Sequence, residues 1–481
     1  MVEAWVSRWG VLVMTAAVSL GACGKEDGGE PVEEAGEPEG QPEGQPEGEP
    51  EVVDEAALTF HRDIKPLLDE KCNQCHLEGG VAPFPLETYA QVQPLLGVIR
   101  QSVEDGSMPP WQPDDACAPL EGNLSLSGEQ RSKLLAWLDD GMAEGDPSTA
   151  APSTITPVAQ LDRVDMTLQL PVAYKPEIFP DDYRCFVVDW PETEEKFVTG
   201  FKTNPDNKAI VHHVIAFSIA PQAVAEYEAL DAAQEGPGYT CYGGPGGQNQ
   251  IGGGVGWLAS WVPGIRNVKF PEGTGIRVEP GSKLVIQMHL NSLGGDPAPD
   301  RSTFELTLAD EVEREAFILP FANPAWLRGD GMQIPAGDED VSHSFAFDIT
   351  GFLSRLTGGR LPNGAILIHG TGLHMHTLGS RGKASILRGG QEEECMLEIP
   401  DWDFNWQGSY TFPEPKRFEP GDELSLECHW DNSAANQPFV PVDKDGDGEM
   451  DAFEQAEPRD VRWGEGTFDE MCLTAVYVTA P

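Results

Sequence analysis

The chain has 481 residues, 40% of them hydrophobic, which at roughly 150 residues per domain predicts about three domains with more than one buried core. It carries 80 acidic against 31 basic side chains, a formal net charge of -49 at pH 7. Such a charge repels nucleic acid and anionic membrane surfaces and attracts cations and basic partners. The composition therefore excludes a DNA- or RNA-binding role.

The first 23 residues predict a lipoprotein signal peptide. Arg8 precedes an apolar run, residues 9–20, that is too short to span a bilayer comfortably. The sequence LGAC, which ends at Cys23, resembles a bacterial lipobox, in which the cysteine is lipidated; the alternative is an ordinary signal peptide with a chance cysteine. Gly24 follows, which by resemblance to sorted lipoproteins favours the outer membrane. We expect an exported, lipid-anchored protein of the cell envelope, in an oxidising space where disulfides persist.

Residues 24–56 consist largely of Glu, Pro and Gly, as in PEGQPEGQPEGEP. Almost no apolar side chain is available there to form a core, and the carboxylates repel one another. The segment is predicted to be a disordered acidic linker without a catalytic role.

The sequence KCNQCH contains Cys72, Cys75 and His76 with the spacing C-x-x-C-H. This spacing lets two thiols add to the haem vinyl groups while the adjoining imidazole reaches the iron, so we predict a covalent haem c. Half of a zinc site or a redox-active pair are the alternatives. The distal ligand is assigned to Met108, because GSMPPW resembles the methionine loop of small cytochromes c; His61 or an open site are the alternatives.

A helix is predicted in LSLSGEQRSKLLAWLDDG, with Ser127 as its N-cap and Gly141 as its stop. This helix would close a small all-α, cytochrome c-like haem domain over residues 57–147. A linker rich in Pro, Ser and Thr is expected over residues 148–164.

Beyond residue 165 the sequence changes to short alternating apolar runs broken by Gly and Pro. This pattern predicts antiparallel β-sandwiches and a mainly β protein. The runs are DMTLQLPVAY, NKAIVHHVIAFSIA, GTGIRVEPGSKLVIQMHLNS, STFELTLA, GAILIHGTGLHMHTLG, KASILR, DELSLECHWDN and MCLTAVYVT.

Five of the ten histidines fall in three tight contexts within these runs, IVHHVIAF, VIQMHLNS and LHMHTLG: His212, His213, His289, His374 and His376. Residues two apart in a strand share a face, so the last two imidazoles would stand side by side. The side chains of the adjacent residues His212 and His213 would point to opposite faces of a regular strand. They could bind one ion only at a strand end or where the strand is locally distorted. A lone strand histidine is usually a core or surface residue, but this grouping points to metal binding.

Four of these motifs, NKAIVHHVIAF, GTGIRVEPGSKLVIQMHLNS, LHMHTLG and GEGTFDEMCLTAVYV, resemble in the same order those of the copper type II, ascorbate-dependent monooxygenases. This is the family of dopamine beta-monooxygenase and peptidylglycine alpha-hydroxylating monooxygenase. The resemblance covers about residues 165–481. It implies two antiparallel, jelly-roll-like β-sandwich domains, at 165–309 and 310–481, each with one copper ion facing a shared cleft.

The resemblance also implies the ligands. One copper would be bound by His212, His213 and His289, and the other by His374, His376 and Met471. Imidazole suits copper in both oxidation states, and the soft thioether of Met471 favours Cu(I), the form that binds dioxygen. The site with Met471 is therefore assigned the catalytic role and the three-histidine site the role of electron store. Zinc at either site, or Met471 as core filler, are the alternatives.

The implied function is that of a dicopper monooxygenase, which hydroxylates a C–H bond of a small organic substrate with O2. Electrons would come through the fused haem, from ascorbate or from a periplasmic electron carrier. The alternative is a non-catalytic envelope protein that binds copper or transfers electrons. Peptide amidation is not favoured, because Thr474 and Ala475 follow the Met-Cys where the amidating members resemble one another in a Tyr. The aromatic residues Trp402, Phe404 and Trp406 could line the cleft or belong to the core.

The cysteines of the β region suit an exported protein. The pair Cys428–Cys472 matches a disulfide position of the family, and Cys185–Cys241 is a second predicted pair. Cys117 and Cys395 have no assigned partner, because connectivity does not follow from sequence.

An insertion at residues 443–454, DKDGDGEMDAFE, departs from the family pattern and matches the spacing of an EF-hand calcium loop. The predicted Ca²⁺ ligands are Asp443, Asp445, Asp447, Glu449, Asp451 and Glu454. Pro438 and Pro441 disfavour an entering helix, so we expect a lone calcium loop, with a solvated acidic insert as the alternative.

Overall fold

The computed structural model describes residues 57–78, 82–150, 160–247, 253–262, 268–292, 298–442, 444 and 452–481. Apart from Ala57, all of these belong to one compact unit, residues 58–481. The predicted signal peptide with Cys23, the acidic linker and the calcium ligands Asp443, Asp445, Asp447, Glu449 and Asp451 lie outside the described residues. No helix in the described ranges is both long enough and apolar enough to cross a membrane.

Every described element between residues 57 and 147 is helical. The elements are η1 (Phe60–Ile64), α1 (Lys65–Lys71), α2 (Tyr89–Val92), η2 (Gln93–Leu95), α3 (Leu96–Glu104) and α4 (Gly128–Asp139), followed by η3 (Pro147–Thr149). Helix α4 begins as predicted, because Ser127 and Gln130 form a capping box. Phe60, Leu68 and Trp137 lie in the buried core of these helices.

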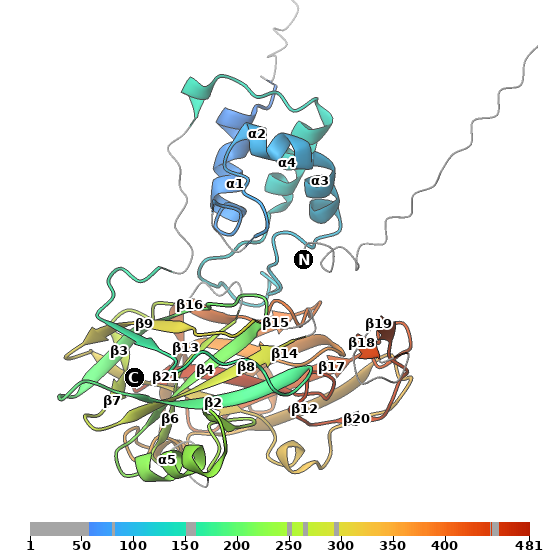
Figure 1. Cartoon of the computed structure of the whole chain (residues 1–481). Helices are drawn as coiled ribbons and strands as arrows, with labels where there is room; N and C mark the ends of the chain where they lie inside the picture. The colour runs from blue at the N-terminus through green and yellow to red at the C-terminus, as the bar shows by residue number, and fades with distance from the viewer. Residues whose placement is uncertain are drawn as a thin grey trace, which may run out of the picture. The chain divides into compact units, whose positions relative to one another are not determined.

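The remainder of the described chain is mainly β, which confirms the predicted class (Figure 1). Its first strands are β1 (Met166–Gln169), β2 (Asp181–Asp189), β3 (Lys196–Asn204), β4 (Val211–Ile219), β5 (Tyr239–Thr240), β6 (Val255–Trp261), β7 (Thr274–Val278), β8 (Lys283–Asn291) and β9 (Thr303–Ala309). The helix α5 (Val224–Ala233) follows β4. All the runs predicted as strands in this half contain a strand.

These strands form two layers around one core. One layer has the order β1-β9-β3-β7 and the other β5-β2-β8-β4-β6. In β9, alternate residues such as Phe304 and Leu306 are buried, as expected when one face of a sheet is covered. They share a buried cluster with Phe186 of β2, in the opposite layer.

The second half contains the remaining elements. They are β10 (Arg314–Phe321), η4 (Trp326–Arg328), β11 (Gln333–Ile334), β12 (Val341–Phe347), α6 (Leu353–Leu356), β13 (Ile366–His374), β14 (Gly379–Arg388), β15 (Gln391–Ile399), β16 (Ser409–Phe418), β17 (Asp422–Trp430), β18 (Phe439–Val442), β19 (Ala452–Gln455), β20 (Val461–Arg462) and β21 (Leu473–Thr479). One layer has the order β12-β17-β14-β15, and in the other β13 lies between β16 and β21. Their facing side chains share a second core.

Strand β10 connects the two halves. It pairs with β21 along residues 316–321 and also with β6 and β7 of the first half. The two layered halves are therefore joined by main-chain hydrogen bonds, which helps to hold their histidine-bearing strands in a fixed relation.

Three disulfides form in the described residues: Cys428–Cys472, Cys185–Cys241 and Cys117–Cys395. The two predicted pairs are confirmed. The third joins the two cysteines that the sequence left without partners, which are 278 residues apart in the chain.

The Cys117–Cys395 bridge fastens a segment that we call the strap, residues 109–122, to β15 and β16. The N–H of Asp114 donates to the carbonyl of Glu398 (2.8 Å), and the N–H of Glu121 donates to that of Thr411 (2.9 Å). The strap therefore extends from the proposed haem ligand Met108 onto the second β core.

Candidate functional site

His212, His213 and His289 come together on adjacent strands. His213 of β4 lies opposite His289 of β8, and the pairing shifts register between Val211 and His213. This irregularity at the beginning of β4 is the local distortion that lets two consecutive histidines turn toward one place. One nitrogen from each of the three rings lies within 4.8 Å of the others.

Two of the three rings meet through their Nδ1 atoms. The Nδ1 atoms of His289 and His213 are 3.3 Å apart, and the Nδ1 of His212 is buried without a hydrogen-bond partner. The outward Nε2 of His289 bonds the carboxylate of Asp181 (2.8 Å), while Tyr183 stacks on the ring at 4.0 Å. The carboxylate fixes which nitrogen of His289 carries the proton.

Burial keeps these imidazoles neutral. It lowers the pKa of His212 to about 4, and with the neighbouring histidines it holds the pKa of His213 and of His289 well below the ordinary value. A neutral imidazole has one nitrogen with a free lone pair. Three such lone pairs in one buried place, one without a partner, fit a bound metal ion.

His374 and His376 form a second group. His374 is the last residue of β13, whereas His376 lies just beyond the strand, so the strand predicted through both residues ends two residues early. Their ring centres are nevertheless 5.0 Å apart. Burial lowers the pKa of both, that of His376 to about 3.

In this group the Nδ1 atoms face outward. The Nδ1 of His374 bonds the side-chain oxygen of Gln407, and the Nδ1 of His376 bonds the main-chain carbonyl of Asp469 (3.1 Å). Both partners are acceptors, so each Nδ1 carries the proton and each Nε2 keeps its lone pair. This is the opposite arrangement from His289.

Met471 is buried, 6% exposed, in the segment that leads to β21. Leu473 of β21 lies opposite His374 in the sheet, and Cys472 is fixed by its disulfide to Cys428 of β17. These two constraints hold the main chain of Met471 at the end of β13, where the histidine pair lies.

The buried carboxylate of Glu470 reinforces this segment. It accepts hydrogen bonds from the N–H groups of His376 (2.9 Å) and Leu378 (2.6 Å) and from the indole of Trp430 (2.8 Å). Burial raises the pKa of Glu470 to about 7 despite these donors. The turn that carries His376 is therefore fastened to the residue next to Met471.

Phe404 lies against both histidine groups. Its ring stacks on His212, with centres 4.8 Å apart, and meets the ring of His376 edge-on at 5.8 Å. Trp402 is a core residue whose indole donates to the carbonyl of His376 (3.1 Å). Of the aromatic residues left open by the sequence, Phe404 thus belongs to the site and Trp402 supports it from the core.

The haem motif is arranged differently. Cys72 and Cys75 form no disulfide, and the Nδ1 of His76 bonds the carbonyl of Phe84 (2.9 Å), which leaves Nε2 with its lone pair. Such a second contact commonly orients a ligating histidine. Met108 is half-buried, and the alternative ligand His61 is half-buried with neither ring nitrogen hydrogen-bonded.

Glu454 is the one predicted calcium ligand among the described residues. Its side chain is exposed and forms an ion pair with Lys444 (2.9 Å). This contact does not test the predicted loop, whose other ligands lie outside the described ranges.

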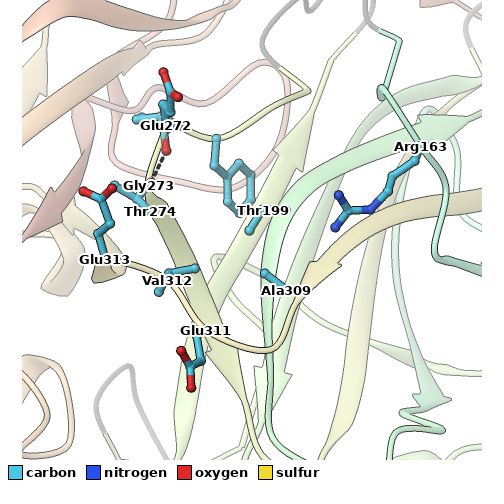
Figure 2. Close-up of a pocket in the computed structure, with 11 residues that line it drawn as sticks. Arg163, Thr199, Glu272, Gly273, Thr274, Ala309, Glu311, Val312 and Glu313 are labelled. Carbon is cyan, nitrogen blue, oxygen red and sulfur yellow. Dashed lines mark hydrogen bonds between the residues drawn. The ribbon is translucent and has the colours of Figure 1, made fainter.

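A pocket of about 570 Å³ is lined by residues that include Phe270, Val312 and the acidic Glu272, Glu311 and Glu313. Figure 2 shows Val312 and the three acidic residues around it. None of the six candidate copper ligands lines it. The pocket is therefore separate from the histidine groups, and its acidic lining gives no reason to assign it a ligand.

Sequence reasoning missed the residues that orient the ligands, namely Asp181, Gln407, Asp469 and Glu470. Asp469 and Glu470 carried a local signal, because they immediately precede the Met-Cys pair. Asp181 and Gln407 had none, because they reach the ligands through contacts between segments far apart in the chain.

Comparisons with known proteins relate this chain to copper monooxygenases. Residues 328–450 match the model of the copper type II ascorbate-dependent monooxygenase C-terminal domain. DBH-like monooxygenase protein 2 of mouse (Mus musculus) is 26% identical over 280 residues, 53% of this chain and 40% of that protein. The protein of corresponding name from Homo sapiens is 23% identical over 269 residues, 53% of this chain and 49% of that protein.

The chain thus spans about half, or less, of the length of these relatives. This chain was also matched to a crystal structure of peptide-N(4)-(N-acetyl-beta-D-glucosaminyl) asparagine amidase. The match covers 66% of this chain and 96% of the amidase chain, at 9% identity, and its TM-score of 0.25 is too low to indicate a shared fold. The family match and the two relatives support the copper type II ascorbate-dependent monooxygenase family, for which copper is expected.

Proposed function

We propose that this protein is a copper-dependent monooxygenase that hydroxylates a C–H bond of a small organic substrate with O2. The observation that carries the proposal is the pairing of two buried imidazole groups that contact the same ring, Phe404. The main chain of Met471 is held at the end of the strand that carries only one of these groups. A site with a soft ligand and a site without one suit two different redox roles.

His212, His213 and His289 would hold one copper ion, and His374, His376 and Met471 the other. Bound there, copper would supply one-electron redox chemistry and dioxygen activation. Hydroxylation consumes one O2, two electrons and two protons, and places one oxygen atom in the substrate and the other in water. Because each site would supply a single electron, both are needed for one turnover.

The chain's own residues would set the conditions for this chemistry. Gln407 and the Asp469 carbonyl hold the protons on Nδ1 of the histidine pair, so that Nε2 is presented to the metal. Phe404 contacts both groups and would limit the access of water to the region between them. Substrate must therefore displace or pack against this ring.

For the supply of electrons we propose a haem c held by Cys72 and Cys75, with His76 as one axial ligand and Met108, or alternatively His61, as the other. The strap supports this role, because it extends from Met108 to the segment that contains Phe404 and Gln407. Trp111 meets Tyr410 edge-on at 5.4 Å, and the side chain of Gln112 donates to the carbonyl of Asp403 (3.0 Å), next to Phe404. Ascorbate is the alternative reductant.

Three further proposals rest on the sequence alone: export as an envelope lipoprotein anchored through Cys23, a location at the outer membrane, and a calcium ion bound by the loop at residues 443–454. They bear on where the enzyme works and on the rigidity of the chain before Met471. They do not affect the assignment of the copper ligands.

Metal analysis combined with oxygen uptake over a panel of substrates tests the proposal. We expect two copper ions and one haem per chain, and oxygen consumption that depends on substrate and reductant. Copper and haem binding without substrate-dependent oxygen uptake would identify an electron carrier instead. Binding of zinc in preference to copper would contradict both functions.

A further inference from the structure

We infer that Asp181 is a positioning residue that couples copper binding at the two histidine groups. The inference rests on the proposed function, in that both groups bind copper. Asp181 is the first residue of β2, and its side chain is only 10% exposed. It contacts one group directly and the other through Thr467.

On one side, Asp181 orients the three-histidine group. Its Oδ1 accepts from the Nε2 of His289 (2.8 Å) and from the side-chain amide of Asn291 (2.9 Å). Because the neutral His289 then carries its proton on Nε2, its Nδ1 lone pair faces His213 and His212. Without the carboxylate, His289 could take the other tautomer, which removes a ligand atom from the group.

On the other side, Asp181 holds the segment that contains Met471. The hydroxyl of Thr467 donates to Oδ1 (2.7 Å) and its N–H to Oδ2 (3.3 Å), and Thr467 is itself buried. The segment from Thr467 to Met471 contains the Asp469 carbonyl and the Glu470 carboxylate, both bonded to His376. The position of Thr467 is thereby connected to the orientation of His376.

The Asp181 carboxylate can accept hydrogen bonds from His289 and Thr467 at the same time only while the distance between the beginning of β2 and the segment 467–471 is maintained. Loss of the carboxylate would leave several buried donors without an acceptor, which is costly and invites rearrangement at both groups. Metal binding that fixes either group therefore fixes Asp181 for the other. By linkage, the coupling acts equally in both directions.

The test is titration of the full-length, metal-free chain with Cu(I) against a chromophoric Cu(I) chelator. Four variants are compared with the parent: Asp181→Asn, Thr467→Val, the double variant that combines them, and the control Asp189→Asn, at the exposed far end of the same strand. Asn keeps the shape of Asp181 but cannot accept from all of its donors.

We expect Asp181→Asn to weaken both copper sites by about 10-fold or more, the usual scale for loss of a contact to a ligating histidine. Thr467→Val, which leaves the contact to His289 in place, should weaken chiefly the site of His374, His376 and Met471. The double variant should be no weaker at that site than Asp181→Asn alone. Asp189→Asn should match the parent.

A second readout separates positioning from general loss of structure. The sulfur contribution to the X-ray absorption spectrum of the Cu(I) protein reports Met471, which Asp181 does not touch, and should diminish in Asp181→Asn. An effect confined to the three-histidine site, or additive effects in the double variant, would overturn the coupling while leaving the proposed function intact. Failure of the parent to bind two copper ions would overturn both.

Discussion

The two histidine groups present opposite ring nitrogens to their centres. In the three-histidine group, the Nδ1 atoms of His213 and His289 converge and the Nε2 of His289 is held by a carboxylate. In the pair of His374 and His376, both Nδ1 atoms are held by neutral oxygen acceptors and Nε2 is left with its lone pair. If both groups bind copper as proposed, this difference would give the two ions different electronic environments.

A carboxylate partner makes an imidazole more electron-rich than an amide or a main-chain carbonyl does. In the proposed sites, the Asp181 contact would therefore favour a stable copper ion at the three histidines, whereas neutral partners and the proposed thioether ligand would leave the other site softer. This contrast agrees with the proposed roles, in which the three-histidine site stores an electron and the site of His374, His376 and Met471 binds dioxygen. The predictions that follow test it, from the largest expected effect to the smallest.

Met471→Ala removes the only soft ligand proposed for either site. Substrate-dependent oxygen uptake should fall by more than the roughly 10- to 100-fold that is typical of losing an outer contact, whereas the three-histidine site should keep its copper. Oxygen-electrode assays and copper analysis measure the two effects. Unchanged oxygen uptake would rule out Met471 as a ligand.

Gln407→Leu removes the acceptor that fixes the proton of His374. We expect the copper affinity of that site, or the turnover rate, to fall by roughly 10- to 100-fold, because the tautomer is no longer fixed. Gln391→Leu, at an exposed position on β15, is the matched control. If the two variants behave alike, the contact to His374 has no role in orienting it.

Replacing both Cys117 and Cys395 with Ser frees the strap from β15. The expected loss in the free energy of unfolding is about 2 to 5 kcal/mol, because the bridge closes a long loop in the unfolded chain. Denaturant titration measures it. If the strap also supports electron supply, haem reoxidation in rapid-mixing experiments should slow in the same variant, and an unchanged rate would speak against that role.

Glu465, in the segment before Met471, makes the stability of the folded protein depend on pH. Burial raises its pKa to about 7 although the Gly243 N–H stabilises the carboxylate. Since the folded pKa exceeds the unfolded one, its stabilising contribution is complete below about pH 4.5 and declines as the pH rises to about 7. After solvent screening we expect a decline on the order of 1 kcal/mol.

Glu465→Gln should reduce this slope in metal-free protein, measured as the difference in unfolding free energy between pH 5 and pH 8, while Glu470, whose pKa burial also raises to about 7, keeps its own contribution. The exposed Glu414→Gln is the control and should keep the slope of the parent. A slope in Glu465→Gln equal to that of the parent would assign the dependence to other groups.

Much of the fold was readable from the sequence, because alternation in runs such as TFELTLA follows directly from burial of one sheet face. The adjacent His212 and His213 were harder, since a regular strand separates neighbours; a register shift beside His213 resolves the difficulty. Such an irregularity depends on the partner strand, β8, and has no local signature. The disulfide between Cys117 and Cys395 likewise depends on the path of the strap.

The residues that hydrogen-bond the candidate copper ligands could not be predicted from the sequence either, because these contacts join segments that lie far apart in the chain. Asp181 is 108 residues from His289 and 286 residues from Thr467, and nothing near it in the sequence marks it as special. Phe404 could be recognised only as an aromatic residue of uncertain placement. The ligands carry a motif, whereas the residues that orient them are defined by the fold.

Copper X-ray absorption of the reduced, fully loaded protein, compared with Met471→Ala, tests the central claim most directly. Two centres of unequal softness predict one sulfur ligand for every two copper ions in the parent and none in the variant, with histidine nitrogen ligands in both. A spectrum without a sulfur ligand in the parent, or one whose sulfur signal survives in Met471→Ala, would contradict the account.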